Sequence, residues 1–134
     1  MMIAGEASGD LHGGQLVKAL KAKKPSVKIF GVGGDNMQNE GMELYYHIND
    51  LAFVGFTEVA RHYLFFRRVF YDLLKIVKSR HPDIVVLIDY PGFNLRFAKK
   101  AKALGVKTYY YIAPQVWAWG AHRAQKMAGY IDRM

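Results

Sequence analysis

The chain has 134 residues, the size of one domain with a full hydrophobic core, and it contains no cysteine, which excludes disulfides, thiolate metal sites and a cysteine nucleophile. Its 19 Lys and Arg outnumber its 11 Asp and Glu, and the formal net charge of +8 favours an anionic partner: nucleic acid, an anionic membrane surface or a phosphorylated substrate. The sequence shows no signal peptide, and no apolar run approaches the roughly 18 residues that a membrane span needs. We therefore expect a soluble protein that faces the cytoplasm.

Strands and helices alternate along the sequence. Hydrophobic periodicity predicts strands at 1–4, 27–32, 44–46, 84–88 and 106–113, and helices at 10–23, 36–39, 56–80, 94–104 and 121–131. This alternation favours a parallel sheet with right-handed crossovers and helices on both faces. We therefore predict an α/β fold of the Rossmann-like class. Because the first strand is short and no strand follows the last helix, we also expect the chain to be part of something larger.

The loop after the first predicted strand carries polar side chains at the start of a helix. It runs Gly5-Glu-Ala-Ser-Gly-Asp10, and free backbone N–H groups there suit a phosphate or oriented sugar hydroxyls. Glu6 and Asp10 weaken the phosphate interpretation, but their carboxylates can accept hydrogen bonds from hydroxyl groups or an amine. Ser8 or Asp10 can instead merely cap the helix. Gly31-Val-Gly-Gly34 lacks the glycine spacing of a dinucleotide fingerprint, so it predicts a nucleotide site only weakly.

The strand predicted at 84–88 consists of five branched apolar residues and runs into Asp89 and a Pro-Gly turn. In open α/β sheets ligands bind at the carboxyl ends of the strands, which places Asp89 at the mouth of the expected site. Its carboxylate can act as a general base, with Asn94 assisting. In the alternative interpretation Asp89 only hydrogen-bonds to a neighbouring loop, and Asn94 caps the next helix.

The segment at 113–120 follows the last predicted strand and belongs to the same edge of the sheet as Asp89. Its Gln115 and Trp117 suit a sugar or acyl surface or a wall between domains, and core packing is the alternative. The five histidines have no metal-ligand spacing, so we predict no metal site.

The region at 53–70 has a wider apolar arc than one buried helix face needs. The helical stripe contains Val59, Tyr63, Phe66, Phe70, Leu73 and Val77, whereas Leu64, Phe65 and Val69 lie outside it. Arginines, among them Arg67 and Arg68, are interleaved. An aromatic and aliphatic surface beside arginines is typical of an interfacial membrane helix. Burial of the helix between the sheet and a partner domain is the alternative.

Five spaced motifs together resemble the lipid-A-disaccharide synthase family over essentially the whole chain. They are Gly5-Glu-Ala-Ser-Gly-Asp10, Gly31-Val-Gly-Gly34 with Met37-Gln-Asn-Glu-Gly41, Val54-Gly-Phe-Thr-Glu-Val59, Ile88-Asp-Tyr-Pro-Gly-Phe-Asn94 and Pro114-Gln-Val-Trp-Ala-Trp119. The resemblance implies an inverting, metal-independent glycosyltransferase of the two-domain GT-B architecture, with no cofactor. It implies that UDP-2,3-diacylglucosamine is joined to 2,3-diacylglucosamine 1-phosphate, with release of UDP, on the inner face of the cytoplasmic membrane.

The resemblance also assigns roles to residues. Residues 1–134 correspond to the N-terminal, acceptor-side domain, and the C-terminal domain that binds the UDP-sugar is absent from the chain, which we therefore expect to be inactive alone. Asp89 corresponds to the catalytic base. The expected substrate-binding residues are Glu6, Ser8, Gly9, Asp10, Asn94, Gln115 and Trp117, and the expected membrane-contacting residues are Leu64, Phe65, Arg67 and Arg68. The partners are then the acylated sugar phosphate, the UDP-sugar and the membrane surface, and not nucleic acid.

Two other classes of protein remain open. The first is a dinucleotide-binding Rossmann domain, because this fold alone hosts many functions. The second is a non-catalytic module that binds anions or membranes.

Overall fold

The computed structural model describes residues 1–51, 59–112, 125 and 127–134, and for 59–62 it describes only the backbone. The elements are β1 (Met2–Ala4), α1 (Ala7–Lys23), β2 (Phe30–Gly33), α2 (Asp35–Asn39), β3 (Glu43–His47), α3 (Ile48–Leu51), α4 (Val59–Arg80), β4 (Ile84–Ile88), α5 (Pro91–Ala103) and β5 (Lys107–Tyr111). The strands form one sheet in the order β3-β2-β1-β4-β5, and every neighbouring pair is parallel.

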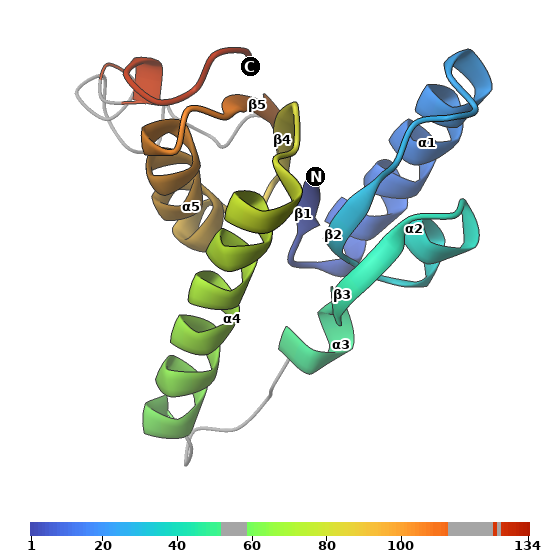
Figure 1. Cartoon of the computed structure of the whole chain (residues 1–134). Helices are drawn as coiled ribbons and strands as arrows, with labels where there is room; N and C mark the ends of the chain where they lie inside the picture. The colour runs from blue at the N-terminus through green and yellow to red at the C-terminus, as the bar shows by residue number, and fades with distance from the viewer. Residues whose placement is uncertain (52–58, 113–124, 126) are drawn as a thin grey trace.

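Helices cover both faces of this sheet, as Figure 1 shows: α1 and α2 lie on one side, and α4 and α5 on the other. A separate hydrophobic cluster fills each interface. The cluster beneath α1 and α2 contains Met2, Ala4, Val17, Ile29, Met37, Met42 and Ile88. The larger cluster on the other face includes Ile3, Val32, Val69, Leu73, Val77, Val85, Leu87 and Phe97. The predicted α/β Rossmann-like fold is confirmed.

The inner strand β4 lies between β1 and β5 and has the predicted ends, and its burial on both faces explains why its sequence is apolar without a break. Val85 and Leu87 point into the cluster with α4 and α5, and Ile88 points into the cluster with α1.

Glycines allow α1 to approach its neighbours closely. A Cβ atom on Gly13 would lie 2.6 Å from the sulfur of Met37, and one on Gly14 would lie 3.0 Å from the Cβ of Asn36. Both contacts are with α2, so the two glycines let the backbones of α1 and α2 come together. Gly9 makes the corresponding contact with the sheet, because its Cβ would lie 3.3 Å from that of Ala4.

Several predicted boundaries are wrong. Helix α1 begins at Ala7 instead of Asp10. Helix α5 begins at Pro91 instead of Asn94, because proline is favourable at the first helical position. Strand β2 begins at Phe30, which pairs with Glu43 of β3, whereas Val27 lies before the residues that pair with a neighbouring strand. The short helix α3 was not predicted. The helix expected at 121–131 lies largely outside the described residues.

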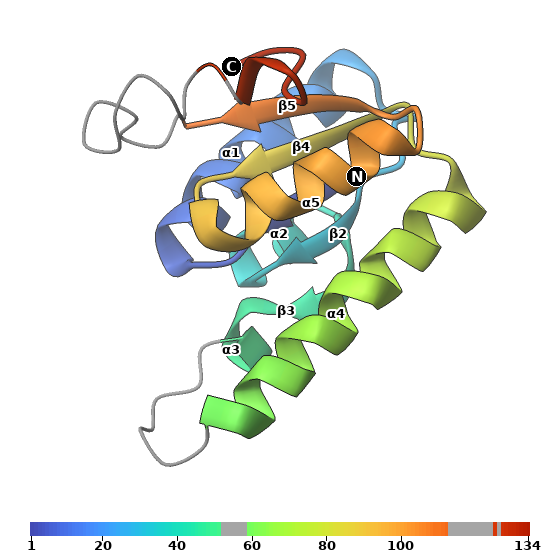
Figure 2. The ribbon, with the colours of Figure 1, turned by 90° about the vertical axis from the view of Figure 1, so that its left-hand side faces the viewer.

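The predicted buried stripe of α4 also needs correction. Val69, placed outside the stripe, is only 1% exposed, whereas Tyr63, placed within it, is 65% exposed. The reason is visible in Figure 2, where the amino-terminal turns of α4 extend beyond the sheet. Within the described part of the chain, no helix is long and apolar enough to cross a membrane.

Candidate active site at the carboxyl ends of the strands

The strand order creates one topological switch point, between β1 and β4. From β1 the chain proceeds to β2 and β3 on one side, whereas β4 and β5 lie on the other. Ala4 and Ile88 are partners in the β1–β4 pair, so Gly5 and Asp89 leave the sheet side by side. In doubly wound sheets ligands bind at the crevice outside this point. The structure thus brings together the two loops that the sequence singled out.

Asp89 sits in an unusual turn that is held by its neighbours. Asp89 and Tyr90 both have left-handed backbones, with φ angles of 48° and 46°. Such conformations cost about 1–3 kcal/mol each, so other contacts must stabilise them. The carbonyl oxygen of Asp89 accepts hydrogen bonds from the Tyr110 hydroxyl at 2.6 Å and from the Asn94 amide at 2.8 Å.

The Asp89 carboxylate is half-buried, and within the described residues it forms no hydrogen bond or ion pair. Its backbone, rather than its side chain, carries the contacts that hold the turn. The alternative in which this carboxylate only ties down a neighbouring loop therefore finds no support among the described residues. The group is accessible to a ligand in the crevice.

Tyr90 joins the two loops. A Cβ atom on Gly5 would overlap its ring, so only glycine fits beneath Tyr90 at this position. Burial, and secondly the charge of Glu6, raise the pKa of the Tyr90 hydroxyl. Burial and the charge of Asp89 raise the pKa of Tyr110 in the same way. Both tyrosines were missed by sequence reasoning, although Tyr90 stands inside the Asp-Tyr-Pro-Gly motif and alternation along β5 points Tyr110 inward.

Glu6 and Ser8 are exposed on the first loop. Glu6 occupies the N-cap position of α1 without a side-chain cap hydrogen bond, so the prediction that Ser8 or Asp10 caps this helix is wrong. The side chains of Glu6 and Ser8 form no hydrogen bond within the described residues, which leaves both free to meet a ligand. Gly9 is buried and packs on the sheet.

Asp10 is 2% exposed and caps a different helix, α2. Its carboxylate accepts backbone N–H hydrogen bonds from Gly34 at 2.6 Å, Asn36 at 3.0 Å and Met37 at 3.1 Å, and one from the Asn36 amide at 2.8 Å. Burial by itself would raise its pKa, but these four hydrogen bonds together outweigh burial and lower it. Asp10 therefore fixes the loop after β2, and a direct contact with substrate stays a prediction.

Asn94 is fully buried in the first turn of α5. The N-cap of that helix is Tyr90, so the capping role considered for Asn94 is wrong. Its amide NH₂ group donates instead to carbonyl oxygens where β1 and β4 end: Asp89, Ile88 at 3.2 Å and Ile3 at 3.4 Å. Its Oδ1 is buried without a partner in the described structure. Asn94 thus positions Asp89 through the backbone, and its contact with substrate stays a prediction.

Gln115 and Trp117 lie outside the described residues. Among the residues that are described, no three His, Asp or Glu side chains stand close enough together to hold a metal ion.

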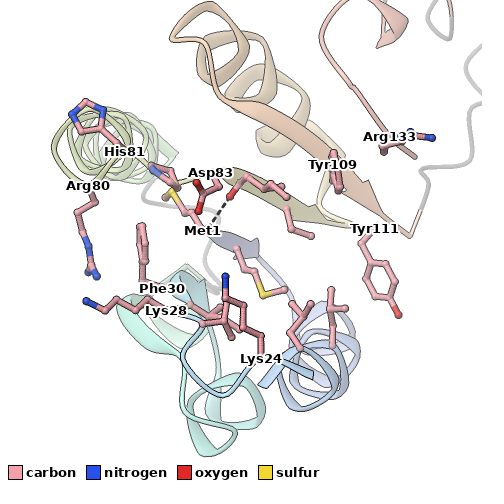
Figure 3. Close-up of a pocket in the computed structure, with 18 of the residues that line it drawn as sticks. Met1, Lys24, Lys28, Phe30, Arg80, His81, Asp83, Tyr109, Tyr111 and Arg133 are labelled. Atoms are coloured by element: carbon pink, nitrogen blue, oxygen red, sulfur yellow. Dashed lines mark hydrogen bonds between the residues drawn. The ribbon is translucent and has the colours of Figure 1, made fainter. Parts of the chain in front are cut away.

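The described residues enclose a larger and a smaller cavity, and the larger one is not at this site. That cavity, of about 820 Å³, lies where β4 begins, and Figure 3 shows Met1, Arg80 and Asp83 around it. The Met1 amino group donates to the carbonyl of Ile84 at 2.8 Å, and burial lowers its pKa to about 6. Asp83 is the one acidic side chain among the described residues that line this cavity. It directly precedes β4, whereas Asp89 directly follows this strand. The smaller cavity, of about 530 Å³, is a groove between α4 and α5 that reaches Tyr90.

Known proteins match this chain throughout. A family model described as lipid-A-disaccharide synthetase matches residues 1–134. Curated proteins named lipid-A-disaccharide synthase are 46% identical in Trichlorobacter lovleyi, 45% in Syntrophus aciditrophicus and 44% in Coxiella burnetii, each over 100% of this chain. The chain spans only 35–36% of the length of these relatives. With its predicted motifs and Rossmann-like fold, the chain belongs to the lipid-A-disaccharide synthase family.

Proposed function

We propose that residues 1–134 form the acceptor-side domain of a glycosyltransferase of lipid A biosynthesis, an inverting and metal-independent hexosyltransferase of the GT-B type. The complete enzyme joins UDP-2,3-diacylglucosamine to 2,3-diacylglucosamine 1-phosphate and releases UDP. The observation that carries this proposal is the family match over the whole chain, together with a free carboxylate, Asp89, at the switch point of the sheet.

In the proposed reaction, a hydroxyl oxygen of the acceptor attacks the anomeric carbon of the donor sugar as the bond to UDP breaks. Asp89 accepts the proton of that hydroxyl, which makes the oxygen a better nucleophile in the transition state. The Glu6 carboxylate accepts hydrogen bonds from hydroxyl groups of the acceptor sugar, and the Ser8 hydroxyl donates to or accepts from them. Asn94 holds the Asp89 turn through the backbone. Gln115 and Trp117 contribute to the same acceptor site.

One contact disfavours the dinucleotide-binding alternative. The backbone N–H groups of Gly34, Asn36 and Met37, which would have to meet a phosphate after β2, are already bound by the Asp10 carboxylate. A fluorescence titration of the chain with NADP or FMN should therefore show no binding.

The exposed face of α4 supports attachment to the inner face of the cytoplasmic membrane. Leu64 is 61% exposed, and Arg67 and Arg68 are exposed beside it. Phe65 is half-buried, with its ring 6.4 Å from that of Tyr46, so it contributes less to this surface than Leu64. Apolar and basic side chains together bind an anionic lipid surface.

The test of the proposed chemistry is Asp89→Asn in an active enzyme, which keeps the shape of the side chain but removes the base. We suggest joining residues 1–134 to the remaining two-thirds of the Trichlorobacter lovleyi relative and measuring steady-state sugar transfer. The substitution should lower kcat by about 10²–10⁴-fold with little change in KM.

Asp83→Asn is the matched control, because it removes a carboxylate at the opposite end of the same strand. It should leave kcat unchanged. Near-normal turnover of the Asp89→Asn enzyme would mean that the base is another group, with Glu6 the next candidate, since Asp10 is held by α2.

A further inference from the structure

The groove between α4 and α5 combines aromatic walls with two cations. It is lined by Tyr63, Phe66, Arg67, Phe70, Tyr71, Tyr90, Gly92, Phe93 and Arg96. The three phenylalanines are half-buried and pack against the core, with the rings of Phe70 and Phe93 5.5 Å apart. Tyr63 and Tyr71 are 65% and 52% exposed. The volume of about 530 Å³ is in the range of small-molecule sites.

Both arginines of the groove are available for an anion. Arg67 and Arg96 are exposed, and neither forms an ion pair within the described residues. The guanidinium of Arg67 lies over the Tyr71 ring, 5.9 Å from its centre. No carboxylate is among the residues that line the groove. A guanidinium without a carboxylate partner is well suited to bind a phosphate.

The groove is continuous with the candidate active site. Tyr90, which directly follows Asp89, lines the groove, and its ring centre lies 6.1 Å from that of Phe93. A ligand in the groove is therefore next to the turn that carries the Asp89 carboxylate. The groove is also concave, which suits the acyl chain of a single ligand molecule. A bilayer instead contacts a protruding surface such as that of Leu64.

We propose that this groove binds an acylated sugar phosphate as a single molecule, with an acyl chain along the phenylalanines and the phosphate at Arg96 and Arg67. This inference rests on the proposed function for the identity of the sugar. The recognition of an acyl chain together with a phosphate follows from the aromatic walls and the two arginines of the groove.

Two probes below their aggregation concentrations separate these claims: 2,3-diacylglucosamine 1-phosphate and dodecyl phosphate, which has the chain and phosphate but no sugar. Isothermal calorimetry with the 134-residue chain should detect binding of both. Arg96→Gln should weaken both about tenfold, the effect of losing a charged hydrogen bond, and should not affect the dephosphorylated diacylglucosamine. Tyr71→Ser should weaken all chain-bearing probes about threefold or more and leave glucosamine 1-phosphate unaffected.

Matched controls remove the same groups from the outside of the groove. Lys99→Gln lowers the net charge by one on the same helix as Arg96, and Leu104→Ser removes an apolar side chain that is 40% exposed. Both should bind the probes like the original chain. An equal loss in Arg96→Gln and Lys99→Gln would overturn the proposal, because only net charge would matter. The proposal would also be overturned if the groove substitutions weakened binding to anionic vesicles but not binding of the two soluble probes.

The groove and the proposed function fail differently. If dodecyl phosphate binds with the expected dependence on Arg96 but the diacylglucosamine phosphate does not, the groove stands and the lipid A substrate is wrong. If neither probe depends on Arg96, the groove proposal is wrong, and Asp89→Asn in the joined enzyme still tests the function.

Discussion

The Asp10 carboxylate links two helices and a strand at a single buried point. It comes from α1, and all of its partners belong to the turn from β2 into α2. An amide in its place has one acceptor oxygen for these donors, and its NH₂ group faces N–H groups. We expect Asp10→Asn to lower the free energy of unfolding by about 2–4 kcal/mol at pH 7, measured by urea denaturation.

The pH dependence checks the same interpretation. Because the folded-state pKa of Asp10 lies below that of the unfolded chain, its stabilisation is present above about pH 4 and is lost as the pH falls through the lower, folded value. The stability difference between the original chain and Asp10→Asn should therefore shrink in acid. Asp35→Asn is the control, since that side chain is 80% exposed, and it should change stability by less than about 0.5 kcal/mol. Equal effects of the two substitutions would contradict this role for Asp10.

The position of Asp89 could be predicted from sequence, whereas the role of Asp10 could not. An apolar run that ends in a carboxylate places that carboxylate at a strand end whatever the details of packing. The partners of Asp10 are 24 or more residues away, and they are reached only because Gly13 and Gly14 let α2 pack against α1. An Asp near the start of a helix is expected to cap that same helix. Here the tertiary contact between α1 and α2 overrides that expectation, and Asp10 caps α2 instead.

The same contrast holds for whole elements. Strand β4 is buried on both faces, and its pattern fixes both of its ends. Strand β2 contains Gly31 and Gly33, which have little strand preference, and the pairing of Phe30 with Glu43 of β3 decides where it starts. Helix α4 carries apolar side chains along its whole length, but only the part that crosses the sheet is covered, so the pattern does not locate its exposed face.

The exposed face of α4 makes a testable prediction about membranes. Replacing Leu64 by Ser, and Arg67 and Arg68 by Gln, should reduce sedimentation of the chain with anionic vesicles, since each basic side chain near such a surface contributes about 1 kcal/mol. The thermal midpoint should change by only a few degrees, because these side chains are exposed. Phe65→Ser would confuse the result, since Phe65 packs against Tyr46.

Lys23→Gln with Lys99→Gln is the control, because it removes two positive charges from exposed positions on α1 and α5, away from that face. Vesicle binding should be reduced less by this pair than by the α4 substitutions. Unchanged binding after the α4 substitutions, or unfolding, would instead favour burial of this face against a partner domain.

At the scale of the whole molecule, the described chain has a continuous parallel sheet with a hydrophobic cluster on each face, but only about a third of the length of its curated relatives. Two buried clusters that share one sheet should unfold together, so we expect a single cooperative transition in urea, followed by circular dichroism and by tryptophan fluorescence. Two separated transitions would contradict this expectation.

If the donor sugar nucleotide is bound by the part of the relatives that this chain does not span, the 134 residues alone should bind UDP weakly or not at all and should transfer no sugar. Isothermal calorimetry with UDP tests this directly, with the joined Trichlorobacter lovleyi enzyme as the positive control. The acceptor analogue should still bind the isolated chain, because the carboxylate of Asp89 and the groove beside Tyr90 are both formed by its own residues. Tight binding of UDP to the isolated chain would place the donor site here, and the assignment of this domain to the acceptor would then be wrong.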